Sequence, residues 1–305
     1  MSEIPVTDTE EATGVFVEHR ELLFGVVYNM LGSVTDTEDV LQDTWLSWSR
    51  RGAGGIDNPR AYLVRIAVNH ALQRRAVVNR RRETYVGPWL PEPLLTEEAS
   101  ADDPALRTES VSLAMLVVLE SLSPLERAVF VLHEVFGYAH TEIAEIIDRT
   151  PAAVRQLAHR ARAHVHARRP LYEAHPRVRR EATERFVRAA LGGDIAELME
   201  ILAPDVTVWT DGGGMRKQAL RPVHGREKAA RLLTGYAKRG GAQALGTSME
   251  LRYRRVNGDD AAVLFEHDSP YAVIVLDLTP EGDRVSNLFV VTNPDKLTHV
   301  RKEEA

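Results

Sequence analysis

The chain has 305 residues, of which 44% are hydrophobic and 27% are charged, and its formal net charge is −6. This size and composition are typical of a soluble globular protein of two or three domains. The absence of cysteine excludes disulfides, cysteine-ligated zinc and thiol redox sensing. The acidic N-terminus does not look like a signal peptide and no apolar run approaches a membrane span, so we expect a cytoplasmic protein without membrane contact.

Two helices are predicted at the start of the chain. Apolar residues at helical spacing predict the first over residues 13–31, with Gly32 as its stop. Thr35 or Asp36 is expected to cap the second. The apolar side of the second helix includes Trp45, which we expect to pack in the core. Its other side carries Glu38, Asp39, Gln42 and Asp43.

A strongly basic helix is predicted next, over the segment from Asn58 to Arg82. Asn58 can cap it, and Pro59 suits the first helical position. The segment holds seven arginines and no acid, and its apolar residues recur close to helical spacing. A helix with one buried and one arginine-rich face suggests a polyanion partner, although a simple solvated basic face remains an alternative.

The sequence D-T-E-D-V-L-Q-D-T-W-L, followed by P-R-A-Y-L-V-R-I-A-V-N-H-A-L-Q-R-R, resembles region 2 of an extracytoplasmic-function (group IV) sigma factor of bacterial RNA polymerase. The resemblance implies that the acidic helix binds the β′ clamp of core RNA polymerase and that the basic helix reads the −10 promoter element. An amide can pair with a base edge, and arginines neutralise phosphates and stack on unpaired bases. The implied −10 residues are Arg60, Arg65, Asn69, Gln73, Arg74 and Arg75; the implied polymerase-binding residues are Glu38, Asp39, Gln42 and Asp43.

Residues 87–110 contain four prolines and six acids, which predicts an extended linker. In sigma factors the equivalent linker threads the catalytic and RNA-exit channel of the polymerase; a simple solvated linker is the alternative. The expected domains are therefore region 2 over residues 1–86, this linker, region 4 over residues 111–170 and a further domain over residues 171–305.

Residues 111–169 are predicted to form helices that end in a helix-turn-helix. Ser123 and Glu126 form a predicted capping box, and Thr150 is expected to cap a long last helix that carries several arginines and no acid. The segment resembles sigma region 4, which reads the −35 element. Many relatives carry a polar or basic residue where this chain has Leu157, so its −35 preference is expected to differ. The candidates for base contacts are Arg155, Gln156 and His159, and those for phosphate contacts are Arg160 and Arg162.

Two other interpretations of this region were weighed. His159, His164 and His166 could suggest a metal site, but no acid or cysteine accompanies them, so we expect no metal and no cofactor. A helix-turn-helix by itself would also suit a repressor. Two basic elements joined by an acidic linker, together with the ordered residues that resemble region 2, favour a sigma factor.

The last third of the chain is predicted to be an α+β cone. Helical patterns over its first part are followed by strand-like segments separated by turns, which predicts helices packed on a curved antiparallel sheet. The order resembles the SnoaL-like branch of the NTF2-like superfamily. The overall fold class is thus two all-α sigma domains followed by an α+β cone.

Three short motifs match a sigma-factor subgroup that is fused to such a domain: W-L-P-E-P, D-G-G-G and N-P-D-K-L. The resemblance implies that this domain replaces a separate anti-sigma factor and acts in cis. A glycine turn between strands is the simpler explanation of the second motif, and a tail tied back on the sheet is that of the third. The motif residues are Trp89, Leu90, Pro91, Glu92, Pro93, Asp211, Gly212, Gly213, Gly214, Asn293, Pro294, Asp295, Lys296 and Leu297.

The same cone also hosts enzymes. Asp211, His224, His267 and Asp268 could act as acid and base if they lined a cavity, but superfamily membership does not imply activity. We expect no enzyme, and we keep an unidentified small ligand of the cavity among the partners. The predicted function is that of an alternative sigma factor regulated in cis. A ligand-responsive helix-turn-helix regulator without polymerase affinity is the alternative, and it has no use for the acidic helix.

Overall fold

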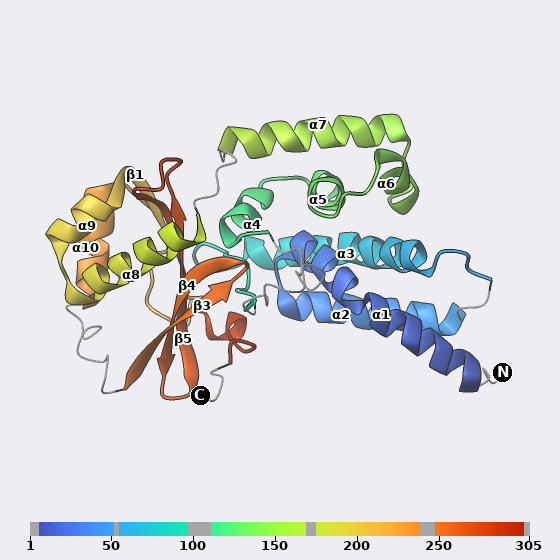
Figure 1. Ribbon diagram of the computed structural model, residues 1–305, viewed down its shortest axis with the longest axis horizontal. Coiled ribbons are helices and arrows are strands. Elements are labelled where there is room, and N and C mark those ends of the chain that lie inside the picture. The colour runs from blue at the N-terminus through green and yellow to red at the C-terminus, as the bar shows by residue number, and fades with distance from the viewer. Residues whose placement is uncertain (1–5, 52–54, 97–110, 169–174, 238–247, 302–305) are drawn as a thin grey trace. The chain divides into compact units, whose positions relative to one another are not determined.

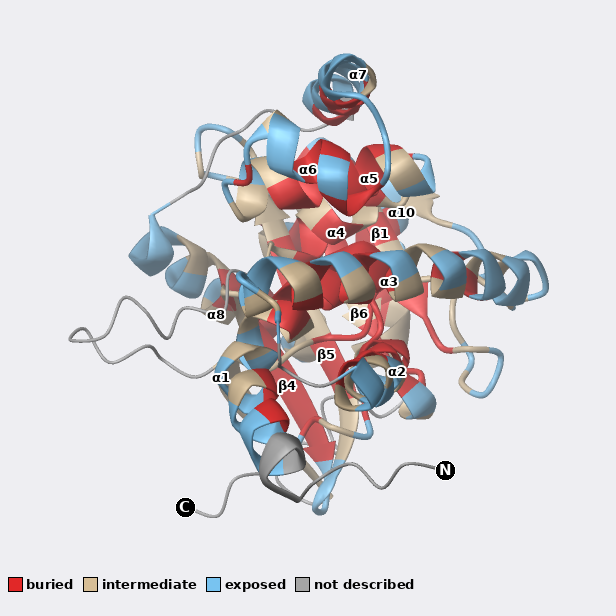
Figure 2. Cartoon of the chain, turned by 90° about the vertical axis from the view of Figure 1, so that its right-hand side faces the viewer, coloured by how far each residue is buried: buried red, intermediate tan, exposed pale blue. Residues whose placement is uncertain are grey.

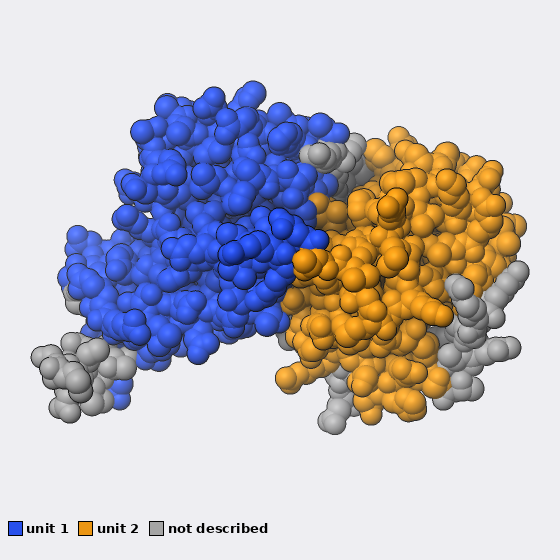
Figure 3. Space-filling view, turned by 180° about the vertical axis from the view of Figure 1, so that it is seen from behind, with its two compact units in different colours: residues 1–83, 101–111, 118–169 blue, residues 84–100, 112–117, 170–305 orange. Residues whose placement is uncertain are grey.

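The computed structural model describes residues 6–51, 55–96, 111–168, 175–237 and 248–301. The chain forms two compact units (Figure 3). Unit 1 comprises residues 1–83, 101–111 and 118–169, and unit 2 comprises residues 84–100, 112–117 and 170–305. The first part of the predicted linker thus belongs to unit 2, while its acidic part, residues 97–110, lies outside the described residues.

The first half of unit 1 consists of α1 (Val6–Leu31), α2 (Val34–Arg51) and α3 (Pro59–Glu83), which pack on one another. Trp48 is fully buried between them, and its indole nitrogen donates to Ala12 O at 2.8 Å. Asn58 caps α3 as predicted, since its side chain accepts from Ala61 N at 3.0 Å. The predicted cap of α2 was wrong.

Ser33 caps α2 instead of Thr35 or Asp36, and its hydroxyl accepts from Asp36 N at 3.1 Å. Asp36 therefore lies inside the first turn, where it is buried. Trp45 packs on Phe16 with 5.4 Å between the ring centroids, as predicted, but it is half-buried and lies at the edge of the core.

The second half of unit 1 contains α4 (Leu113–Leu119), whose first residues belong to unit 2, α5 (Pro124–Phe130), η2 (Val131–Val135), α6 (His140–Ile146) and α7 (Pro151–Arg168). The capping box of Ser123 and Glu126 is formed as predicted. Thr150 Oγ1 accepts from Ala153 N at 3.2 Å and caps α7. One side of α7 is buried and the other is exposed (Figure 2).

Unit 2 contains the α+β domain. Its helices are α8 (Pro176–Gly192), α9 (Ile195–Ile201) and α10 (Arg226–Tyr236), followed near the C-terminus by the short η4 (Pro294–Lys296). Its described strands are β1 (Leu202–Asp211), β2 (Val223–His224), β3 (Met249–Val256), β4 (Asp259–Glu266), β5 (Ser269–Leu278) and β6 (Val285–Val291). They form one sheet in the order β2-β1-β6-β5-β4-β3 (Figure 1).

The predicted all-antiparallel sheet was wrong at one position, because β1 and β6 pair in parallel. After β1 the chain passes through β2 and α10 and then runs from β3 to β6 as an antiparallel meander that starts at the far edge of the sheet. The last strand therefore reaches β1 in the same direction. The predicted architecture, helical domains followed by an α+β domain, is confirmed.

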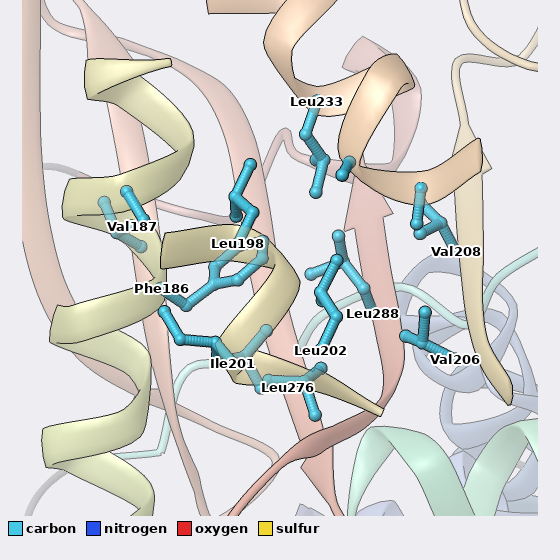
Figure 4. Close-up of a cluster of buried hydrophobic side chains, with 14 of the residues drawn as sticks. Phe186, Val187, Leu198, Ile201, Leu202, Val206, Val208, Leu233, Leu276 and Leu288 are labelled. Carbon is cyan, nitrogen blue, oxygen red and sulfur yellow. The ribbon is translucent and has the colours of Figure 1, made fainter. Parts of the chain in front are cut away.

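Both faces of this sheet are buried, as alternating residues show. On one face, Leu276 and Leu288 pack against Phe186 of α8, Leu198 of α9 and Leu233 of α10 (Figure 4). The opposite face has a second core, formed by the side chains that alternate with these. Its members include Val263, Val275 and Phe289 from strands, Leu90 from the linker, Leu113 and Ala114 from α4, and Leu297 and Val300 from the C-terminal segment. The linker is thus part of the hydrophobic core of unit 2.

Candidate nucleic-acid interface and linker-docking site

Helix α3 presents four of the six predicted −10 residues on its exposed side. Arg60, Arg65, Asn69 and Gln73 are all solvent-exposed. Figure 2 shows that α3 has both exposed and buried residues along its length. Asn69 also makes contacts within unit 1: its Nδ2 donates to Arg65 O at 2.8 Å and to Ile146 O, at the end of α6, at 3.1 Å. Its side-chain oxygen is the group left to accept a bond from a base.

Arg74 joins α3 to α2. Its Nε donates to Asp36 Oδ1 at 2.7 Å, and its Nη2 bonds to Asp39. Burial by itself would lower the pKa of Arg74, but the bonds and charges of Asp36 and Asp39 outweigh burial and raise it. One predicted −10 residue and one predicted polymerase-binding residue therefore bond to each other here.

Arg75 lies on the buried side of α3, although the sequence grouped it with the DNA-binding residues. Its side chain is only 4% exposed, and its Nη2 is 2.7 Å from Glu120 Oε2. Arg82 and Arg127 pair with the same carboxylate. Arg75 follows the buried positions Val68 and Ala71 at helical spacing, so in this structure it packs inside unit 1 and does not face a nucleic acid.

Burial lowers the pKa of each arginine in this cluster. That of Arg75 falls to about 10, and burial, followed by the charges of Arg75 and Arg127, lowers that of Arg82 to about 8. Three cations that share one carboxylate repel one another, and Glu120 offsets only part of this repulsion. Glu120, which the sequence gave no reason to select, is therefore the residue on which this contact between α3 and the start of region 4 depends.

The four predicted polymerase-binding residues lie along α2. Gln42 and Asp43 are exposed, and Leu46, one turn further on, exposes 42% of its area. Glu38 is exposed as well, but it pairs with Arg20 at 2.7 Å. A polar surface with an exposed leucine beside it is suited to docking another protein.

Helix α7 carries the predicted −35 residues on its exposed side. Arg155, Gln156 and His159 are exposed there. The two predicted phosphate contacts are exposed too but bond to acids of the preceding helices: Arg160 Nε lies 2.9 Å from Glu126 Oε1, and Arg162 Nε lies 2.6 Å from Glu134 Oε1.

Leu157 lies on the opposite side of α7. It is buried, so its side chain packs within unit 1, and the predicted difference in −35 preference stays a prediction. Within the described part of the chain, no group of three or more histidines and acids is arranged to hold a metal ion, and His159, His164 and His166 point from exposed positions of α7.

In unit 2, the three short motifs meet at the carboxylate of Asp211. Asp211 Oδ2 accepts from Leu90 N at 2.8 Å and from Lys296 Nζ at 2.7 Å. Lys296 Nζ also donates to Leu90 O at 2.6 Å and lies 3.5 Å from the centre of the Trp89 ring. Lys296 and Asp211 are 3% and 0% exposed. One buried ion pair thus holds the W-L-P-E-P motif on the α+β domain.

Tyr85 is a fourth partner that the sequence did not identify. Its hydroxyl donates to Asp211 Oδ1 and accepts from Asn293 Nδ2 at 2.7 Å. Burial, followed by the bond to the Asp211 carboxylate, raises the pKa of Tyr85 well above its usual value, so the hydroxyl remains a donor. An aromatic residue four positions before Trp89 was the available signal.

The glycines of D-G-G-G are required by close packing. Gly213 has φ +60°, and a Cβ there would lie 2.5 Å from Asn293 Nδ2. Gly214 has φ +76° and packs on Val86. The motif is a glycine turn after β1, as the simpler interpretation predicted, and the turn also brings N-P-D-K-L against it.

The linker makes a second set of contacts with the end of β3. Asn257 N donates to Leu94 O at 2.8 Å, and Thr96 N donates to Arg255 O at 3.0 Å. His299 Nε2 lies 2.6 Å from Pro93 O. The described part of the linker is therefore docked along the α+β domain and is not a free solvated chain.

Two segments of the chain match models of known protein families. Residues 15–82 match the model of Sigma-70 region 2, and residues 112–165 match that of Sigma-70, region 4. The ECF RNA polymerase sigma factor SigJ of Mycobacterium tuberculosis is 34% identical over 284 residues, which cover 92% of this chain and 91% of SigJ. The chain belongs to the ECF RNA polymerase sigma factors.

One further relative and the solved structure of SigJ agree with this assignment. The probable ECF RNA polymerase sigma factor SigI of the same species is 28% identical over 289 residues. This match covers 93% of this chain and 94% of SigI. The crystal structure of M. tuberculosis SigJ has a TM-score of 0.74 at 32% identity and covers 94% of this chain and 98% of that one. The α+β domain is therefore a shared part of these sigma factors.

As an ECF sigma factor, the protein binds core RNA polymerase and directs transcription initiation at promoters. Its relatives indicate a transcription factor and not an enzyme. The four residues considered for catalysis do not gather at one site: Asp211 is bonded to the linker, His224 is exposed on β2, and His267 and Asp268 form the turn after β4. Among the described helices, none combines the length and apolar character that crossing a bilayer requires.

Proposed function

We propose that the α+β domain regulates this sigma factor in cis by holding the linker, and that the docked linker restrains transcription. The observation that carries the proposal is the buried contact of Lys296 and Asp211 with Leu90. A linker that enters the polymerase channel, as the sigma-factor resemblance implies, has to leave these partners first. Breaking the dock therefore belongs to the path from the free protein to the initiating complex.

The burial of the docked residues supports this restraint. Leu90 is fully buried in the second core of the sheet, and Pro91 and Pro93 are buried as well. Burying a leucine side chain contributes about 1.5–3 kcal/mol. Release of the linker also breaks the bond between Lys296 Nζ and Leu90 O. Several contacts therefore have to break together before the linker can leave the α+β domain.

We further propose that α3 and α7 bind promoter DNA through their exposed residues and that α2 binds the β′ clamp. Arg60, Arg65, Asn69 and Gln73 are the −10 candidates, because their side chains are exposed. Arg74 joins them only when it releases Asp36 and Asp39. On α2, Gln42 and Asp43 are accessible without any rearrangement.

The contacts within unit 1 support a resting state of the DNA-binding helices. Asn69 bonds to Ile146 O, Arg160 to Glu126 and Arg162 to Glu134. Arg160 and Arg162 would bind phosphates more freely after releasing these acids, whereas Asn69 keeps its side-chain oxygen available while its Nδ2 stays bonded. Separation of α3 from α6 is the step that would release Asn69.

Run-off transcription with purified core polymerase tests the regulatory proposal. Lys296→Met keeps the length of the side chain but removes the charge that holds Asp211 and Leu90. We expect more promoter-dependent transcript than from the wild type, together with faster exchange of the Leu90 amide hydrogen. Lys228→Met, on the exposed side of α10, is the matched control and should change neither.

The point variant is a sharper test than truncation after Arg169. Such a truncation removes the sheet but keeps Leu90 and Leu113, whose side chains would lose the core that buries them. Faster exchange at Leu90 in Lys296→Met with an unchanged transcript level would show that the linker is docked but not restraining, and would reject the proposal.

A further inference from the structure

Unit 2 contains a cavity of about 320 Å³ between the sheet and its helices, and this cavity is partly open. Helices α8 and α10 and strands β1, β4, β5 and β6 contribute its walls. Part of its lining belongs to the core shown in Figure 4, namely Phe186, Val208, Leu233 and Leu288. Well-packed cores leave few voids larger than a water molecule, so an opening of this size needs an explanation.

The lining defines the chemistry of an occupant. Among the described residues that line the cavity, none carries a charge. Tyr236 OH donates to Gln218 Oε1 at 2.8 Å, and Gln218 Nε2 donates to Thr292 Oγ1 at 3.0 Å. A charged molecule would lose its hydration here without gaining a counter-charge, whereas an uncharged one can bond to the amide.

The size of the cavity further limits which uncharged molecules can occupy it. Its volume is roughly twice the ~150 Å³ of an engineered apolar cavity that binds benzene. An uncharged molecule of two or three rings, or an aliphatic chain of similar bulk, with one hydrogen-bonding group near Gln218 fits both the volume and the lining.

The polar wall of the cavity is bonded directly to the residue that holds the linker. Thr292 donates to Asp211 O twice, from its backbone nitrogen at 2.7 Å and from its hydroxyl at 3.2 Å. The carboxylate of Asp211 accepts from Leu90 N. Gln218, Thr292 and Asp211 therefore form a short chain of contacts from the cavity to the linker.

A second contact links the cavity to the loop that follows D-G-G-G. The guanidinium carbon of Arg216 lies 4.0 Å from the centre of the Tyr271 ring, and Tyr271 lines the cavity. Arg216 N also donates to Gly212 O at 3.2 Å. A movement of Tyr271 would therefore shift Arg216 and, through its bond to Gly212 O, the glycine turn that follows Asp211.

We propose that this cavity binds a small uncharged apolar molecule through Gln218 and that its occupancy changes how firmly Asp211 holds the linker. An occupant that bonds to the Gln218 amide competes with Thr292 for the same Nε2 hydrogens. Loss of that bond frees the Thr292 hydroxyl and alters one of the two bonds that Thr292 donates to Asp211 O. The linker half of this inference rests on the proposed function; the binding half does not.

Binding is tested with phenylnaphthylamine, an uncharged probe with a single N–H whose fluorescence rises in apolar surroundings. Its sulfonated analogue anilinonaphthalenesulfonate has the same rings and a negative charge. We expect the full-length protein to bind the uncharged probe at least about tenfold more tightly than the sulfonate. Equal binding of the two probes would contradict a neutral cavity.

Two variants locate the probe. Ala190→Phe fills the cavity from α8, and Gln218→Glu introduces a charge into its wall; each should weaken the uncharged probe by about tenfold or more. Ala182→Phe, on the same helix but outside the lining, is the control and should leave binding within about twofold. Unfolding curves show whether Ala190→Phe folds. If this variant does not fold, binding to Gln218→Glu alone shows whether the probe occupies the cavity. Binding that neither cavity variant weakens overturns the assignment.

Coupling is tested by hydrogen exchange at Leu90 N, with and without saturating phenylnaphthylamine. We expect the probe to change this exchange rate by about threefold or more in the wild type and not in Gln218→Met, which keeps the bulk but not the bond to Thr292. A probe that binds the cavity without changing Leu90 exchange overturns the coupling. The proposed function fails separately, if Lys296→Met frees the linker without altering transcription.

Discussion

Glu120 lies among three arginines of unit 1, and Glu120→Ala tests how far this cluster holds α3 in place. Its Oε2 is 2.7 Å from Arg75 Nη2, its Oε1 is 2.5 Å from Arg127 Nη1, and it also pairs with Arg82. Arg75 and Arg127 are almost completely buried. Removing the carboxylate therefore leaves these cations in a poorly solvated site without their acid.

The expected loss is large because one partner of a buried ion pair is removed, a change that costs about 3–5 kcal/mol. Arg75 Nη1 keeps Met30 O at 3.1 Å, and Arg127 Nε keeps Asn29 O at 2.8 Å, which softens the loss. We expect a decrease of about 3–4 kcal/mol in the free energy of unfolding of unit 1. For a unit of this size, that lowers its melting temperature by about 10 °C.

Denaturant unfolding of the full chain, combined with hydrogen exchange of the α3 and α5 amides, measures this change. Exchange is needed because the two units need not unfold together. Glu83→Ala, at the exposed end of α3, is the control and should cost less than about 0.5 kcal/mol. A loss below about 1 kcal/mol for Glu120→Ala would refute the role assigned to the cluster.

Three further changes have defined outcomes. Asn69→Ala should reduce discrimination between −10 sequences by about 1–3 kcal/mol, measured with competing promoter fragments, while core-polymerase affinity stays the same. Gly213→Ala should destabilise unit 2 by about 1–2 kcal/mol or more in thermal unfolding, because φ is +60° and the new Cβ would meet Asn293. Burial, followed by the charge of His133, lowers the pKa of His140 in the folded protein. The unfolded chain therefore binds a proton at His140 more readily than the folded chain does. The free energy of unfolding of unit 1 should fall as the pH drops below about 6.5. His140→Gln should flatten that part of a pH series of unfolding midpoints.

Each of these outcomes has a clear contradiction. An equal loss of promoter selectivity and polymerase affinity in Asn69→Ala would mean that the asparagine supports the helix and does not read DNA. Gly14→Ala is the control for the glycine change, since a Cβ there has no neighbour within 4 Å and α1 should tolerate it. If Gly213→Ala and Gly14→Ala lower the melting temperature equally, close packing at Gly213 does not explain the loss of stability. An unchanged pH profile in His140→Gln would remove the histidine from the explanation.

Local chemistry allowed the helices of both sigma regions to be predicted from the sequence. Asn58, Ser123 and Thr150 each cap the helix expected of them, because a cap bonds to a backbone nitrogen only a few residues away. The motif order of region 2 also predicted the family before any geometry was known. These features depend on neighbours in the chain, which the sequence lists in order.

The side of a helix on which each arginine lies was less easily predicted. The resemblance to region 2 and its positive charge place Arg75 among the expected DNA-binding residues, yet its spacing from Val68 and Ala71 puts it on the buried side. Charge alone suggested the wrong environment, and the partner that makes burial tolerable, Glu120, lies 45 positions away.

Helix patterns, caps and ordered motifs are local, so they were sufficient to predict a sigma factor with two helical regions, a linker and an α+β domain. The contacts that hold the linker became visible only in the folded protein. Asp211 meets Leu90 and Lys296 from 121 and 85 positions away, and β1 pairs in parallel with β6. Such contacts exist because the sheet brings distant strands together, and no local spacing encodes which ends will meet.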